Sequence, residues 1–79
     1  MEFIELSGKT LLRIVQDDEP FAQLDEKELS RIGVTDESIL RVNRQGDIEL
    51  RRGHGWDVIG GLLGEYEDRL YEETGLDWA

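Results

Sequence analysis

Carboxylate side chains are concentrated near the C-terminal end of the sequence, between Glu65 and Asp77. Carboxylates catalyse hydrolysis when two of them face each other across a cleft and burial raises the pKa of one. Here they are spread along one segment with helical spacing, which places them on the surface of a helix. The pattern therefore predicts no active site, and we expect the protein not to be an enzyme.

The same segment is suited to binding another protein. Surface carboxylates attract a basic partner, and exposed aromatic side chains can anchor it. We therefore predict a contact surface for a protein partner that is expected to be basic, and we assign to it Glu67, Asp68, Tyr71, Glu72 and Trp78. On this hypothesis the protein is a small, acidic, non-catalytic interaction module that uses no cofactor.

The other residues of chemical interest have ordinary explanations. His54 is the only histidine and stands between two glycines, where the sequence places no nucleophile beside it. Residues 8–10, Gly-Lys-Thr, match the end of a phosphate-binding loop, but Phe3 stands where that motif requires its first glycine. The acids of residues 17–19 can bind a divalent cation weakly, and they lack the alternation and the glycine of a calcium loop. A weak divalent-metal-binding domain is our third functional hypothesis, without a specific metal site.

The charge of the chain argues against a nucleic-acid ligand. Nineteen acidic and nine basic residues give a formal net charge of −10. Such a chain repels nucleic acid and anionic lipid. The basic residues are concentrated at Arg41, Arg44, Arg51 and Arg52, and two of these are expected to pair with acids on neighbouring strands. We therefore favour a protein partner, no nucleic acid and no membrane.

Size and composition predict one soluble domain. The 79 residues, of which 38% are hydrophobic, suit a single folded domain over residues 1–79. The sequence has no cysteine, so stability must come from packing or from oligomerisation, and a homodimer is possible. No apolar run approaches the roughly 20 residues that span a bilayer, and the first residues lack the basic start of a signal peptide. The expected location is the cytoplasm.

Residues 39–59 have the pattern of a three-stranded antiparallel meander. With residues 44–46 as a three-residue loop, apolar residues pair with apolar ones and Arg41 pairs with Glu49. Gly46 stands at the end of this loop, where a left-handed residue is favoured.

A second loop of the same length is expected at residues 53–55. It would pair Leu50 with Val58 and Arg52 with Trp56. One face of the meander would then be apolar and would need a cover. The residues predicted for this face are Leu40, Val42, Ile48, Leu50, Trp56 and Val58.

Two helices are predicted from their end signals and apolar spacing. The first spans residues 25–32, where Asp25 and Glu28 form a capping box and Gly33 is a left-handed stop. The second spans residues 62–74, followed by Gly75. Its apolar stripe is the natural cover for the meander, and the apolar residues after it, Leu76 and Trp78, are expected to fold back onto the domain.

Residues 2–15 are ambiguous between two structures. Clustered Ile, Val and Thr residues around Gly8 favour a β-hairpin with residues 7–9 as its loop. The alternative is a strand followed by a short helix, residues 9–15, behind Ser7. The predicted fold class is α+β: a small antiparallel sheet, made of an N-terminal hairpin and the meander 39–59, is packed by the helix 62–74, with the short helix 25–32 at one edge. The sequence leaves open whether the strands form one sheet or a small barrel.

Residues 28–51 resemble the second half of the AbrB/MazE swapped-hairpin proteins. The shared pattern is a helix, a glycine followed by Ile or Val, a short polar turn, and two strands around a glycine. The resemblance implies a dimeric DNA-binding regulator or an antitoxin, for which the acidic end, Glu65 to Trp78, would suit a toxin-binding tail. The first hairpin of that family is basic, whereas here only Lys9 and Arg13 are available. An antitoxin or transcription regulator of this type is our second functional hypothesis.

Overall fold

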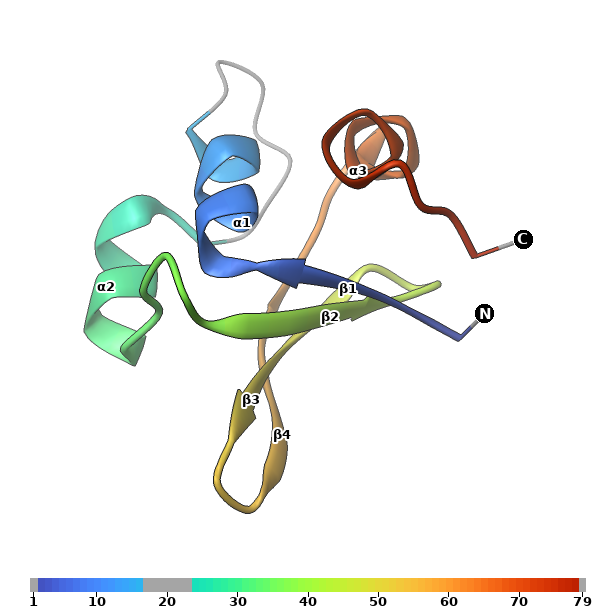
Figure 1. Ribbon diagram of the computed structural model, residues 1–79. Helices are drawn as coiled ribbons and strands as arrows, with labels where there is room; N and C mark the ends of the chain where they lie inside the picture. The colour runs from blue at the N-terminus through green and yellow to red at the C-terminus, as the bar shows by residue number, and fades with distance from the viewer. Residues whose placement is uncertain (1, 17–23, 79) are drawn as a thin grey trace.

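A computed structural model describes residues 2–16 and 24–78 of the chain. Four strands and three helices follow one another along this part of the chain (Figure 1). In order they are β1 (Phe3–Ser7), α1 (Gly8–Val15), α2 (Glu26–Ile32), β2 (Ile39–Asn43), β3 (Asp47–Arg52), β4 (Gly55–Gly61) and α3 (Tyr66–Thr74).

All four strands belong to one antiparallel sheet with the order β1-β2-β3-β4. The predicted α+β class is therefore confirmed, and the strands form one sheet. β1 pairs directly with β2, so that Ile4 lies opposite Val42 and Leu6 opposite Leu40. The N-terminal strand thus extends the meander by one strand on its β2 side.

The predicted N-terminal hairpin is wrong, and the alternative of a strand followed by a helix is correct. α1 begins directly after β1, because the Ser7 hydroxyl oxygen accepts a hydrogen bond of 3.2 Å from the backbone N–H of Thr10. Leu11 and Ile14 share one face of α1 and are completely buried. Burial of this helical stripe outweighs the β-propensity of the Ile, Val and Thr residues, because tertiary packing regularly overrides local propensity.

Gly8 permits the sharp turn from β1 into α1. A Cβ atom at this position would lie 1.7 Å from the backbone oxygen of Thr35. The backbone N–H of Gly8 donates to the oxygen of Ser38 over 2.8 Å. The start of α1 is therefore packed directly against the loop that leads into β2.

The predicted register of the first hairpin is confirmed. Arg41 lies opposite Glu49, and the flanking apolar residues pair with each other. Gly46 ends the three-residue loop with a φ of +88°. Inside the loop, the side-chain oxygen of Asn43 accepts hydrogen bonds from the backbone N–H groups of Gln45 and Asp47.

The predicted register of the second hairpin is wrong. The turn contains two residues, so Arg52 pairs with Gly55 and Arg51 pairs with Trp56. This shift by one position moves Trp56 to the opposite face of the sheet, because side chains alternate along a strand. Arg41 gives Trp56 a partner on that face, since its guanidinium carbon lies 4.2 Å from the centre of the Trp56 ring.

The same shift moves Val58 to that face as well, and a β-bulge follows it in the ladder. Ile48 pairs with Gly60 and Glu49 pairs with Val58, which leaves Ile59 as the additional residue of β4. Val58 is 66% exposed, and its predicted place on the apolar inner face is wrong. On the inner side, Leu24 occupies the space over Gly60, where a Cβ atom would lie 2.7 Å from the Leu24 side chain.

The helix predicted at residues 25–32 is confirmed as α2. A side-chain oxygen of Asp25 accepts a hydrogen bond of 2.8 Å from the backbone N–H of Glu28. Gly33 ends the helix with a φ of +102°. Leu29 is completely buried and fastens this short helix to the core.

The last helix ends where it is predicted to end and starts later. α3 stops at Thr74, and Gly75 follows in the left-handed conformation. It starts at Tyr66 instead of residue 62, because the backbone N–H of Leu62 donates to the oxygen of Gly46 over 2.8 Å and so extends the sheet. Gly64, with a φ of +66°, then turns the chain into the helix.

One hydrophobic cluster holds these elements together, and it lies on one face of the sheet. Figure 1 shows α1 and α3 on the same side of β1 and β2, while the end of the β3–β4 hairpin projects away from them. In the described part of the chain, all three helices bury residues in this cluster, and none of them is long and apolar enough to cross a membrane. The cluster consists of Ile4, Leu6, Leu11, Ile14, Leu24, Leu29, Val34, Leu40, Val42, Ile48, Leu50, Leu62, Leu70 and Trp78.

Candidate functional site

Four of the five residues predicted to bind a partner lie on the outward face of α3. Successive residues of a helix are rotated by about 100°, so Glu67, Tyr71, Asp68 and Glu72 fall within an arc of about 140° around α3. The buried Leu70 lies outside this arc. All four side chains are exposed, and Tyr71 is 57% exposed. We call these four residues the acidic α3 face.

Ion pairs on the inward side fasten α3 to α1. Glu73 accepts from Arg69 on the same helix at 3.1 Å and lies 3.7 Å from Arg13 of α1. Arg69 also donates to the backbone oxygen of Arg13 over 3.3 Å. The helix is therefore held by its inward side, which leaves its outward side available for contact.

The carboxylates of the acidic α3 face are only weakly engaged within the protein. Glu72 lies 3.6 Å from Arg69, and 68% of its side chain is exposed. Within residues 2–16 and 24–78, Glu67 and Asp68 have no basic group within ion-pair distance. Their charges therefore face solvent and contribute to an attractive potential for a basic molecule.

Trp78, the fifth predicted residue, lies in the core. Its side chain is only 7% exposed, which confirms that the end of the chain folds back onto the domain. The indole N–H donates to the backbone oxygen of Val42 over 3.1 Å. The Tyr66 ring meets the indole edge to face, with the ring centres 6.2 Å apart. Trp78 therefore joins the C-terminal segment to the sheet and does not present its ring as an anchor for a partner.

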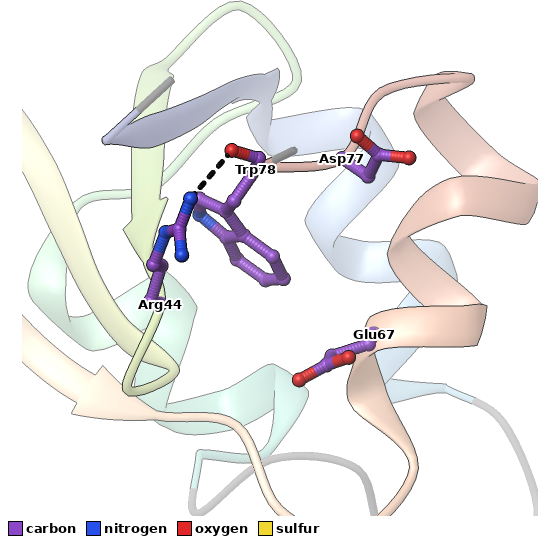
Figure 2. A pocket seen from close by; sticks show the side chains of 4 residues that line it. All are labelled: Arg44, Glu67, Asp77 and Trp78. Atoms are coloured by element: carbon purple, nitrogen blue, oxygen red, sulfur yellow. Dashed lines mark hydrogen bonds between the residues drawn. The ribbon is translucent and has the colours of Figure 1, made fainter.

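A surface pocket borders the acidic α3 face. It has a volume of about 340 Å³ and is lined by Arg44, Glu67, Asp77 and Trp78. Figure 2 shows Glu67 of α3 across the hollow from Arg44 and the indole. Arg44 donates to the backbone oxygen of Trp78 over 2.8 Å. Glu67 belongs both to this pocket and to the acidic α3 face, so a ligand on α3 can extend into the pocket.

The described residues offer no arrangement for metal binding. Among them, no group of three His, Asp or Glu side chains is close enough to hold an ion. The acids at 17–19, on which the metal hypothesis depends, lie outside the described residues. His54 is exposed in the turn between β3 and β4.

A second feature of the surface was missed by the sequence analysis. On the face of the sheet opposite the core, the guanidinium carbon of Arg41 lies 3.7 Å from the centre of the Phe3 ring and 4.2 Å from that of Trp56. The same guanidinium donates to Glu49 over 3.0 Å. This cluster depends on the observed register of β4, and the predicted register would have placed Trp56 on the other face.

No protein-family model matches the chain, and comparisons with curated proteins and with solved structures found no match. Residues 28–51 fold as α2, β2 and β3, the order that the AbrB/MazE resemblance implies. In this chain the two strands pair with β1 and β4 of the same molecule. The regulator or antitoxin role stays a prediction.

Proposed function

We propose that the protein is a small, acidic, non-catalytic interaction module that binds a basic protein through the acidic α3 face. The observation that carries this proposal is the exposed Tyr71 ring among three carboxylates on the outward side of one helix. The Tyr71 ring supplies contact area for a partner, and the neighbouring carboxylates supply electrostatic attraction.

The charge of α3 favours a basic ligand over an acidic one. The helix contains four carboxylates and one arginine, and the arginine is engaged with Glu73. The whole chain, with α3 included, has a formal net charge of −10. Long-range attraction of this kind raises the rate of association and falls with salt over a screening length of about 8–10 Å.

The pocket beside α3 gives the partner a second point of contact. A lysine or arginine side chain that lies along α3 can reach Glu67, whose carboxylate belongs to both surfaces. The wall formed by Trp78 is already in place, because its indole is held by Val42 and Tyr66. A preformed wall lowers the ordering that binding requires.

The test is affinity capture of proteins on the immobilised chain, followed by binding measurements on the captured partner. The variant Glu67→Gln/Asp68→Asn/Glu72→Gln removes three outward charges and changes the net charge from −10 to −7. Three exposed ion pairs at about 0.2–1 kcal/mol each correspond to a roughly 3- to 150-fold weaker complex. Binding of the unchanged protein should also weaken steeply between about 0.05 and 0.5 M salt.

A matched variant separates the α3 face from total charge. Glu26→Gln/Asp36→Asn/Glu37→Gln also removes three exposed carboxylates, all of them away from α3. We expect this variant to bind as the unchanged protein does. Equal losses in both variants would mean that total charge alone attracts the partner, and equal retention in both would mean that the α3 face is not the contact surface.

A DNA mobility shift at low salt separates this proposal from the regulator hypothesis. The described β1 and α1 carry Lys9 and Arg13 as their basic residues, and Arg13 lies near Glu73. We expect no shift with duplex DNA. A sequence-specific shift would favour the regulator instead.

A further inference from the structure

β1 is an edge strand of the sheet, and in the described part of the chain no strand lies on its outer side. Its residues pair with β2 in an unbroken register from Phe3 to Ser7. Apart from this ladder, residues 3–6 take part in no backbone–backbone hydrogen bond among the described residues. The backbone N–H and C=O groups of a strand alternate between its two sides, so those on the outer side of β1 are available to another chain.

The opposite edge of the sheet is less suited to a further strand. β4 is interrupted by the bulge at Ile59. A bulge bends the strand and distorts the row of backbone groups at an edge, which hinders the addition of another strand. β1 has no such interruption, so it is the edge that better suits an extended segment of another protein.

A hollow beside β1 suits a long basic side chain. It has a volume of about 410 Å³ and is lined by Glu2, Phe3, Glu5, Arg41 and Leu76. Leu76 is 39% exposed and forms an apolar wall together with the Phe3 ring. Arg41 forms its ion pair with Glu49, and the exposed carboxylates Glu2 and Glu5 have no ion pair within the described residues. Lysine and arginine fit such a place, because they lay an aliphatic stem on apolar surface and keep their charge outside it.

A second hollow of the same kind follows further along β1. It has a volume of about 330 Å³ and is lined by Glu5, Leu6, Ser7, Glu37, Ser38 and Ile39. Ile39 is 43% exposed and Glu37 is an exposed carboxylate, so apolar surface again lies beside negative charge. The first hollow includes Phe3 and Glu5 and the second includes Glu5 and Ser7, a step of two residues along the strand. Every second side chain of an extended segment lies on the same face, about 6.5–7 Å from the previous one, which matches this step.

We propose that β1 binds an extended basic segment of the partner protein as an additional strand. Main-chain hydrogen bonds to the outer side of β1 supply affinity, and lysine or arginine at every second position of the segment supplies specificity through the two hollows. The proposal rests on the proposed function for the basic partner, and it adds the conformation and the sequence pattern of the bound segment. Leu76 lines the first hollow and lies two residues after the end of α3, so one partner can contact the acidic α3 face and β1 together.

A short synthetic peptide of alternating lysine and valine is the probe. Amide hydrogen exchange of the full chain, followed by NMR, measures each backbone N–H of β1. In the free protein the N–H groups on the outer side of β1 should exchange fast, and the peptide should slow their exchange. A peptide of alternating lysine and proline has the same charge, but its prolines cannot donate to a strand ladder. This control peptide should leave the exchange of β1 unchanged.

Two variants with the same loss of charge locate the bound peptide. Glu2→Gln/Glu5→Gln/Glu37→Gln removes three exposed carboxylates around β1 and changes the net charge from −10 to −7. The loss of three exposed ion pairs should weaken binding of the lysine–valine peptide roughly 3- to 150-fold. The variant described above that removes three carboxylates from the acidic α3 face has the same net charge, and it should retain most of the affinity for this peptide.

Three results would overturn the proposal. The first is exchange of the β1 amides that stays unchanged at about 1 mM of the lysine–valine peptide. The second is equal slowing of this exchange by both peptides, which would mean that charge alone attracts them. The third is a loss of peptide affinity in the α3 variant without a loss in the β1 variant. This last result would place the peptide on α3, so the proposed function would stand while the strand addition would fail.

Discussion

Replacement of Trp78 should destabilise the folded protein, although the sequence suggests a role for this residue in partner binding. The side chain is 7% exposed, donates a hydrogen bond to Val42 and packs edge to face on Tyr66. Truncation of a buried tryptophan to alanine costs about 3–5 kcal/mol. A domain of 79 residues has a total stability of about 4–12 kcal/mol. Trp78→Ala should therefore leave the chain marginally folded.

A second substitution separates the hydrogen bond from the packing. Trp78→Phe keeps an aromatic ring in the core and removes the indole N–H that donates to Val42. The loss of this bond and of part of the ring should cost about 1–3 kcal/mol. Urea denaturation followed by circular dichroism gives the free energy of unfolding for each variant.

Tyr71→Ala is the matched control, because Tyr71 is 57% exposed and lies on the outward side of α3. Surface substitutions of this kind change stability by about 0.5 kcal/mol or less. We expect Tyr71→Ala to weaken partner binding and to unfold as the unchanged protein does. A Trp78→Ala variant with a free energy of unfolding within about 1 kcal/mol of the unchanged protein would refute the core role of the indole.

Two further predictions concern positions where the backbone sets the structure. Gly8→Ala should lower the melting temperature far more than Gly33→Ala. The new Cβ at position 8 would lie 1.7 Å from the Thr35 oxygen, whereas a Cβ at position 33 meets nothing within 4 Å and adds only the strain of a positive φ, about 1–2 kcal/mol. Equal melting temperatures of the two variants would contradict the tight turn at Gly8. Asp25→Ala should lower the free energy of unfolding, measured by urea denaturation, by about 0.5–2 kcal/mol, because it removes the hydrogen bond that caps the backbone N–H of Glu28. Asp25→Asn should keep most of this stability, since an amide oxygen also accepts such a bond. An Asp25→Asn variant as unstable as Asp25→Ala would mean that the charge, and not the hydrogen bond, stabilises α2.

Local signals were sufficient for the first hairpin and for α2. The loop of residues 44–46, the pairing of Arg41 with Glu49 and the cap at Asp25 each depend on residues that are close in the sequence. A glycine at the end of a short loop indicates a left-handed residue of a hairpin, and a carboxylate before a helical stretch indicates an N-cap. These elements could therefore be placed with their correct residues.

The start of α1 could not be decided from local signals. Residues 10–15 have a β-prone composition, and only the fold shows that Leu11 and Ile14 point into the cluster while Gly8 contacts Thr35. The strand that β1 pairs with is β2, more than thirty positions later in the sequence. A hairpin within residues 2–15 would have paired β1 with the residues that directly follow it. Local sequence signals do not show that β1 pairs with a distant strand instead.

The second hairpin shows how a small error in register changes the functional surface. The loop is one residue shorter than predicted, so Trp56 and Val58 lie on the face of the sheet opposite the core. From the sequence alone both registers are plausible, because Arg52 would lie opposite Trp56 in the predicted register and forms an ion pair with Asp57 in the observed one. The contacts of Arg41 with both rings join residues from three strands, and such a cluster is visible only when the strands are assembled.

The sequence by itself determined the α+β class, the caps of α2, the first loop and the four outward residues of α3, because each follows from spacing along one element. Only the tertiary structure decided that Trp78 is buried, that residues 8–15 form a helix, and which residues lie on the face of the sheet opposite the core. The physical reason is that burial depends on which distant elements meet, and aromatic residues suit a core and a binding surface equally well. The acids of the acidic α3 face, Glu67, Asp68 and Glu72, leave no such ambiguity, because a carboxylate without a buried partner is costly to bury and therefore faces solvent.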